Sequence, residues 1–134
     1  MTTPALDTLR LSLHVLAATV WVGGQLTIAG LLGTLRRLGP EAPKSLARAF
    51  ARLSWPAYAV LVLTGLWNIQ AVHPSTQDTL WQALLGVKVG VVALAGLAAW
   101  LHSRARTPGG IAAWGAATGL TSLAALVLGV VLAG

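Results

Sequence analysis

Four long apolar runs, separated by short polar connections, organise this chain. The runs cover about residues 11–35, 55–72, 80–101 and 111–133. Each is close to the roughly 20 residues that an α-helix needs to cross the hydrocarbon core of a bilayer. The pattern therefore predicts an all-α integral membrane four-helix bundle, formed by a single four-span domain over residues 1–134.

The segment between the first two spans, residues 38–54, has a helical period with two distinct faces. Its apolar positions, spaced by three and four, are Leu46, Ala49, Phe50 and Leu53. Its basic positions, spaced by four on another face, are Lys44, Arg48 and Arg52. A helix with one apolar and one basic face is suited to the membrane surface. We therefore predict a short amphipathic cytoplasmic helix here, which leads directly into the second span.

Composition supports the membrane assignment. Apolar residues make up 56% of the chain and charged residues 9%, whereas soluble proteins average about 25% charged residues. A soluble domain of this size would expose larger apolar patches than soluble monomers tolerate. The lipid bilayer is therefore the expected partner of most of the surface.

Gly and Ala lie on several faces of the first and fourth spans. Because small residues favour close helix contacts in lipid, we expect a homo-oligomer.

Basic residues are concentrated in two connections. Seven of the nine Lys and Arg residues follow the first span or the third: Arg36, Arg37, Lys44, Arg48, Arg52, Arg104 and Arg106. The connection between the second and third spans has none. Because cytoplasmic loops are enriched in Lys and Arg, we expect a cytoplasmic (inner) membrane protein with both termini outside. The same rule accounts for the net charge of +6 without a nucleic-acid partner.

Two ionisable side chains lie inside the predicted spans, His14 in the first and Lys88 in the third. A charge at the bilayer centre costs about 2.5–3.5 kcal/mol on insertion scales, so such residues are candidates for function. Lys88 lies about 12 Å from the outer end of its helix, which is long for a side chain that snorkels to water. With both termini outside, both residues fall in the outer half of the membrane. We predict that they share one pocket.

Other side chains extend this predicted pocket. Trp21 lies seven residues after His14 and shares its helix face, and Asn68 lies in the outer half of the second span. The predicted cofactor-binding residues are therefore His14, Lys88, Trp21 and Asn68. His73, in the outer connection, is a second candidate metal ligand beside His14, although a solvated loop histidine is the simpler interpretation. The Thr and Ser hydroxyls of the fourth span are expected to form hydrogen bonds between helices.

Three short motifs resemble the copper resistance protein D family of membrane domains. They are His14 followed by Trp21-Val22-Gly23-Gly24, Arg52-Leu53-Ser54 leading to Leu63-Thr64-Gly65, and Trp81-Gln82-Ala83-Leu84-Leu85-Gly86-Val87-Lys88. Together they cover most of the chain, about residues 11–106. A more distant similarity extends to the membrane protoporphyrinogen oxidase of the haem pathway. The resemblance implies an association with haem b and a pairing of a first-helix His with a third-helix Lys, which carries over to His14 and Lys88.

Ligand chemistry leaves two cofactors open, a copper ion and haem b. The family name implies copper binding or transport across the cytoplasmic membrane, with His14 and His73 as candidate ligands. Cu(I) prefers thiolate and thioether ligands, but the chain has no Cys and one Met. The alternative is a small b-type haem-binding redox protein with His14 as axial ligand and Lys88 as second ligand or propionate partner. If it is an enzyme, we expect a haem-dependent membrane oxidoreductase. A structural subunit without a cofactor is the third possibility.

Overall fold

The structure, a computed structural model that describes residues 3–134, is all-α over that range. In chain order its elements are α1 (Pro4–Ala18), a π-helical turn η1 (Thr19–Gly23), α2 (Gly24–Arg37), α3 (Glu41–Val72), a short 3₁₀ turn η2 (Pro74–Thr76), α4 (Thr79–Arg104) and α5 (Pro108–Ala133). No strand occurs among the described residues. The predicted fold class is therefore confirmed.

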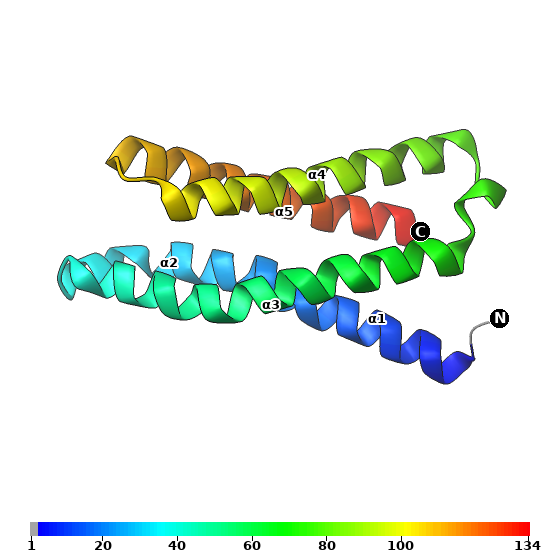
Figure 1. Cartoon of the computed structure of the whole chain (residues 1–134), viewed down its shortest axis with the longest axis horizontal. Helices are drawn as coiled ribbons and strands as arrows, with labels where there is room; N and C mark the ends of the chain where they lie inside the picture. The colour runs from blue at the N-terminus through cyan, green and yellow to red at the C-terminus, as the bar shows by residue number, and fades with distance from the viewer. Residues whose placement is uncertain (1–2) are drawn as a thin grey trace. The chain divides into compact units, whose positions relative to one another are not determined.

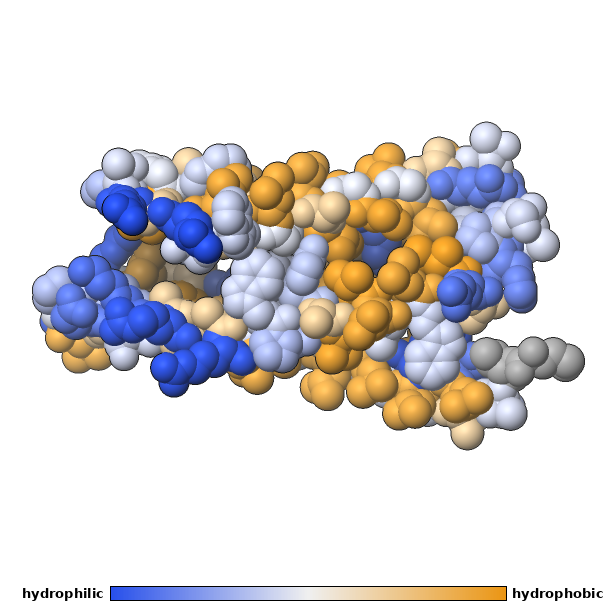
Figure 2. Space-filling model, viewed as in Figure 1, coloured by the Kyte–Doolittle hydropathy of each residue, from blue (hydrophilic) through white to orange (hydrophobic). Residues whose placement is uncertain are grey.

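Four helical stretches are long and apolar enough to cross a membrane: Pro4–Arg37, Glu41–Val72, Thr79–Arg104 and Pro108–Ala133. Large apolar side chains are exposed along them, including Val15 (63%), Leu63 (66%) and Val130 (66%). On the face drawn in Figure 2, hydrophobic residues cover the middle of the helices and hydrophilic residues gather towards their ends. Such exposure is stable in lipid and unstable in water. The chain is a multi-pass membrane protein with four spans, as the sequence predicts.

The chain divides into two compact units, residues 1–72 and 73–134. In the first unit α1, η1 and α2 form one long helical run that packs antiparallel to α3. In the second unit α4 packs antiparallel to α5 (Figure 1). We call these two pairs the first hairpin and the second hairpin.

Side-chain caps mark where the helices begin. The Thr3 hydroxyl accepts a hydrogen bond from the Leu6 N–H at 3.4 Å, and Pro4 follows it at the first helical position. The Asp78 carboxylate accepts from the Trp81 N–H at 2.8 Å at the start of α4. The Thr107 hydroxyl does the same for the Gly110 N–H at 3.1 Å, with Pro108 next in the chain. Each cap satisfies an N–H that lacks a partner within its helix. The first span thereby begins before residue 11, where the apolar run starts, and includes two charged residues.

The amphipathic segment is helical, as predicted, and it continues without a break into the second span, so it forms the first part of α3. Its basic side chains Lys44, Arg48 and Arg52 are exposed. Its apolar face lines an open groove together with residues of η1 and α2, and the lining residues are Val20, Gly24, Thr27, Ile28, Leu46, Ala49, Phe50 and Leu53. The amphipathic pattern is therefore explained by a helix that packs on α2 with its apolar face and exposes its basic side chains on the other face.

Candidate functional site

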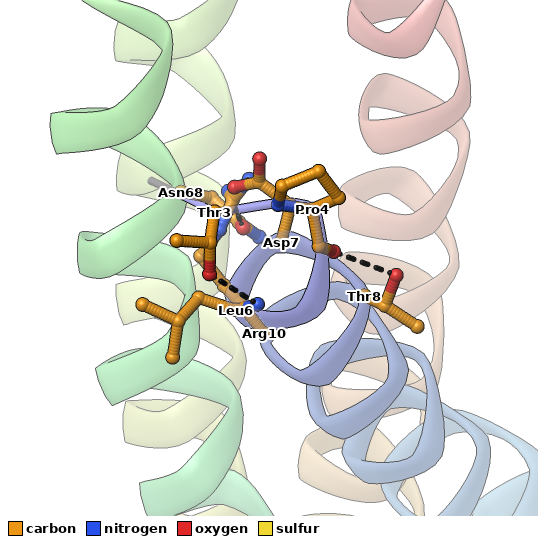
Figure 3. Close-up of polar contacts among 7 residues, drawn as sticks. All are labelled: Thr3, Pro4, Leu6, Asp7, Thr8, Arg10 and Asn68. Atoms are coloured by element: carbon orange, nitrogen blue, oxygen red, sulfur yellow. Dashed lines mark hydrogen bonds and ion pairs between the residues drawn. The ribbon is translucent and has the colours of Figure 1, made fainter. Parts of the chain in front are cut away.

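A polar cluster joins α1 to α3 near the start of the chain (Figure 3). Arg10 of α1 donates from Nη1 to the Asn68 side-chain oxygen of α3. It also donates from Nη2 to the Asp7 carboxylate, at 2.9 Å, as an ion pair one turn apart on α1. Thr8 lies on the opposite side of α1, where its hydroxyl donates to the Pro4 carbonyl at 2.9 Å. Asp7 and Arg10 thus use the face of α1 that packs on α3.

Arg10 is buried to an unusual degree for its residue type, with 6% of its surface exposed. Its Nε is the one buried side-chain nitrogen or oxygen among residues 3–134 that has no hydrogen-bond partner. A buried donor without a partner costs about 1–3 kcal/mol, and more when the group is charged. The guanidinium is therefore held by two acceptors while one of its donors stays unsatisfied.

His14 lies one helical turn after Arg10, and its Nδ1 is 2.9 Å from the Thr64 hydroxyl oxygen of α3. Thr64 is buried and lies one turn before Asn68. The two cross-helix pairs, Arg10–Asn68 and His14–Thr64, are thus stacked about 6 Å apart along the helices. We call these four residues the polar ladder.

The hydrogen bonds of Thr64 determine the tautomer of His14. The Thr64 hydroxyl lies 2.7 Å from the Val60 carbonyl oxygen and 3.2 Å from that of Leu61. A hydroxyl has one proton, and carbonyls only accept, so Thr64 donates to its own helix. It then accepts from His14, which must carry its proton on Nδ1. In the neutral ring the lone pair is then on Nε2, which is the ring nitrogen that would act as a metal ligand.

Gly65 keeps space beside this imidazole. A Cβ at residue 65 would lie 3.5 Å from His14 Cε1, in ordinary van der Waals contact, so a larger side chain would press on the ring. Trp21 is only 3% exposed and packs with Trp55 and Tyr58 at ring-centre distances of 5.7 and 4.6 Å. Trp21 is therefore a core residue of the first hairpin, two helical turns after His14.

Lys88 belongs to the second hairpin, where its ammonium lies against α5. A Cβ at Gly129 would lie 2.9 Å from Lys88 Nζ and 3.6 Å from Cε. The side chain therefore uses the space that this glycine leaves on the neighbouring helix. His14 and Lys88 are in different units, so their shared pocket stays a prediction.

The other two histidines have different settings. His73 is exposed and has a left-handed backbone, with φ of 52°, just before η2. Its carbonyl accepts from the Thr76 N–H and hydroxyl, so the backbone of His73 organises this turn. His102, at the end of α4, lies 2.9 Å from the Ile111 carbonyl through Nδ1 and packs on Gly115 of α5. It joins the two helices, in keeping with a structural role.

The predicted residues His14 and Asn68 each have a different hydrogen-bond partner from the one that a shared pocket would give. Asn68 contacts Arg10, and the partner of His14 is Thr64. Arg10 is a functional candidate that the sequence interpretation missed, because it lies just before the apolar run that begins at Leu11. The signal was present: Arg10 precedes His14 by four residues and so shares its helix face. The expected interhelical bonds of Thr118 and Thr121 are wrong, since both hydroxyls donate to carbonyls of α5 itself.

Comparison with known proteins adds no relative to this picture. No protein-family model, curated protein or solved structure matches the chain. The roles of the polar ladder and of Lys88 therefore have to be argued from their own geometry.

Proposed function

We propose that the chain is a b-type haem-binding protein of the cytoplasmic membrane, with His14 Nε2 as an axial ligand of the iron. The observation that carries the proposal is the hydrogen bond from His14 Nδ1 to Thr64. Metal-bound histidines characteristically donate their second ring N–H to a protein acceptor, which sets the tautomer and orients the ring. A haem iron held by a histidine supplies one-electron chemistry.

The ligand set favours haem over a copper ion. Within residues 3–134, no three His, Cys, Asp or Glu side chains are grouped closely enough to hold a metal ion. A copper ion bound by protein needs several such ligands, whereas a haem iron already has four from its porphyrin and needs one or two more. His14 fits the second case. Lys88 is proposed, as from the sequence, as a second ligand or a partner of a propionate.

The proposed orientation follows from the basic connections. The ends of α2 and α4 and the first part of α3 carry the exposed basic residues, which we place in the cytoplasm, with both termini outside. His14 and the polar ladder then lie towards the outer face. A cytoplasm-active reporter fused after Gly134 is expected to be silent, and a strong signal from it would contradict this topology.

The haem proposal is tested by the absorption spectrum of the protein purified from haem-supplied membranes. The wild type is expected to show a Soret band, and His14→Ala is expected to lose it while inserting normally. Thr64→Val is expected to reduce haem affinity about 10- to 100-fold, the usual effect of removing such a partner. Thr64→Ser keeps the acceptor and is expected to bind like the wild type.

The matched control is Thr27→Val. Thr27 is an exposed threonine of α2 whose hydroxyl also donates to its own helix, to the Gly23 carbonyl at 2.7 Å. It is expected to leave the Soret band unchanged. A colourless wild type, or a Soret band that survives His14→Ala, would contradict the proposal.

A further inference from the structure

The open groove on the first hairpin suits a hydrocarbon chain. All of its lining residues belong to this hairpin. Its volume is about 400 Å³, within the range of about 300–1,000 Å³ that small-molecule sites occupy. Among the lining residues only Thr27 has a polar side chain, and its hydroxyl already donates to the Gly23 carbonyl at 2.7 Å. The groove therefore offers almost only apolar surface to a ligand.

A row of basic side chains runs along α3 beside this groove. Lys44, Arg48 and Arg52 are spaced by four residues and are exposed. Arg52 follows the groove residue Ala49 by three positions, so it borders the apolar face of the helix. Lys44 is paired with Glu41 at 3.3 Å. The two arginines have neither a hydrogen bond nor an ion pair in the part of the chain that the structure describes.

The level of these arginines along α3 matches that of lipid phosphates. The helix has 32 residues, about 48 Å at 1.5 Å per residue, whereas the hydrocarbon core is about 30 Å thick. The apolar run of this span begins at Trp55, within one turn of Arg52. Helical side chains tilt towards the N-terminus of their helix, so the guanidinium groups extend away from the hydrocarbon core. The first part of α3 is thus placed among the headgroups.

The charge of this region selects an anionic headgroup. Residues 36–52 include five Lys and Arg and one acid, Glu41, and hydrophilic residues gather where α2 meets α3 (Figure 2). A guanidinium has a planar fork of donors that matches the oxygens of a phosphate. A lipid with net negative charge is attracted by such a basic region, whereas the cation of a zwitterionic headgroup opposes the attraction.

We propose that the groove binds an anionic phospholipid, with one acyl chain along the apolar lining and the phosphate on Arg48 and Arg52. Neighbouring faces of one helix then recognise the two chemically different parts of one lipid. A second copy of the chain would bring two sets of basic residues together on this face, which repulsion between like charges opposes. This proposal is independent of the proposed haem function.

The test is a lipid titration of the full chain in neutral detergent, followed by native mass spectrometry. The probes are dioleoyl phosphatidylglycerol and dioleoyl phosphatidylcholine, which have the same acyl chains and differ in net charge. One basic residue beside an anionic lipid contributes about 1 kcal/mol, or about fivefold in affinity. Arg48→Gln and Arg52→Gln are each expected to weaken phosphatidylglycerol binding about fivefold and to leave phosphatidylcholine binding unchanged. The wild type is expected to prefer phosphatidylglycerol about 25-fold, from two such charges.

Matched variants separate the headgroup site from the groove. Lys44→Gln is the charge control and is expected to have a smaller effect than either arginine variant, because Lys44 is already paired with Glu41. Ala49→Phe fills part of the groove and is expected to weaken the binding of both lipids about tenfold, the value of roughly 50 Å² of lost apolar contact. Ala47→Phe adds the same ring at an exposed position of α3 outside the groove lining, and no effect is expected. Helical circular dichroism verifies that each variant is folded.

Three results would overturn the proposal. Equal affinity of the wild type for the two lipids, or a preference that survives in the double variant Arg48→Gln with Arg52→Gln, would exclude the headgroup site. Unchanged lipid binding in Ala49→Phe would show that the acyl chain lies elsewhere. Because the chain has no Cys, Ala49→Cys tests for a different occupant. Efficient disulfide-linked dimers of Ala49→Cys in membranes, absent for Ala47→Cys, would assign the groove to a second copy.

Discussion

The two hairpins hold their helices together by different means. The first hairpin joins α1 to α3 by side-chain pairs, Arg10–Asn68 and His14–Thr64. In the second hairpin, cross-helix hydrogen bonds near each end use backbone carbonyls: Trp81 Nε1 donates to the Leu132 carbonyl at 3.2 Å, and His102 Nδ1 lies 2.9 Å from the Ile111 carbonyl. Between them the helices pack through small residues such as Ala95, Gly96 and Ala98, all buried.

This difference indicates where chemical specificity lies. A backbone carbonyl is present whatever the residue, so the second hairpin depends on shape and tolerates changes in its acceptors. A pair of side chains requires both residue types, so the first hairpin is specific at particular positions. Its helical runs of 34 and 32 residues are also longer than the 26 of each helix in the second. The polar ladder is thus built into the longer and more selective half of the chain.

The largest loss of stability is expected for Arg10→Leu, which tests whether the side-chain pairs hold the first hairpin together. It leaves Asp7 and Asn68 without their shared partner, and because the Asp7 side chain is 36% exposed, we expect the lost charged hydrogen bonds to cost about 1.5–3 kcal/mol. We expect the free energy of unfolding to fall by that order in denaturant titration followed by helical circular dichroism. Adding Asp7→Asn removes the stranded charge and is expected to recover part of the loss. A stability within about 0.5 kcal/mol of wild type, the range of ordinary surface changes, would show that the ladder is not structural.

Gly24→Ala tests the close packing of the first hairpin. A Cβ at this position would overlap the Phe50 ring of α3, so the ring or the helix must shift to accommodate it. Overpacking of this kind costs about 1–3 kcal/mol. Gly30→Ala, on the same helix with nothing within 4 Å, is the control and is expected to be neutral or stabilising. The double variant Gly24→Ala with Phe50→Leu is expected to recover stability; no recovery would contradict the assigned contact.

Trp81→Phe measures what one of the carbonyl contacts is worth in the second hairpin. It removes the indole N–H that donates to Leu132 while keeping an aromatic ring. Interhelical hydrogen bonds in membrane proteins average about 0.6 kcal/mol, and we expect a loss of that size. Trp114→Phe, at an exposed position of α5, is the matched control. A loss above about 2 kcal/mol would mean that this hairpin also depends on a polar contact.

Gly129→Ala is expected to have the smallest effect. The added Cβ would meet only the end of the Lys88 side chain, which can rotate away, so the change in stability should stay below about 0.5 kcal/mol. The control is Gly119→Ala, which has nothing within 4 Å on the same helix. Both are measured by the same denaturant titration as Gly24→Ala. A loss as large as that of Gly24→Ala would show that Lys88 is fixed in place, in contrast to our expectation.

The spans were predictable because hydropathy and length together determine what can cross a bilayer. The sequence also identified His14 and Asn68 as polar residues on adjacent spans. It could not pair them correctly, since pairing depends on the register of α1 against α3. That register places Arg10 opposite Asn68 and His14 opposite Thr64. A shift of one turn would have paired His14 with Asn68.

Arg10 was not predicted because the apolar run begins at Leu11, and the caps that extend α1 back to Pro4 are local features of Thr3 and Pro4. Once the helix starts there, Arg10 becomes an interior residue with a partner three residues earlier. Lys88 was identified from its apolar neighbours alone, and its contact with Gly129 could not be foreseen. Which glycine faces a long side chain depends on how two helices of nearly uniform hydropathy are rotated.

The π-helical turn η1, at Thr19–Gly23, has a consequence for insertions and deletions. Each hydrogen bond of a π turn encloses one residue more than that of an α-helix, so residues beyond it are rotated by about 100° relative to an uninterrupted helix. Deleting one residue here would give a regular helix in which Gly24 still faces Phe50 while Arg10 and His14 keep their partners, because the π turn accommodates one extra residue between two helices that are otherwise in phase. The sequence positions that lie on one helix face therefore shift by one residue at η1. A homologue with one residue fewer between 19 and 23 is expected to have a regular α-helix there and to retain both the polar ladder and the close Gly24–Phe50 approach.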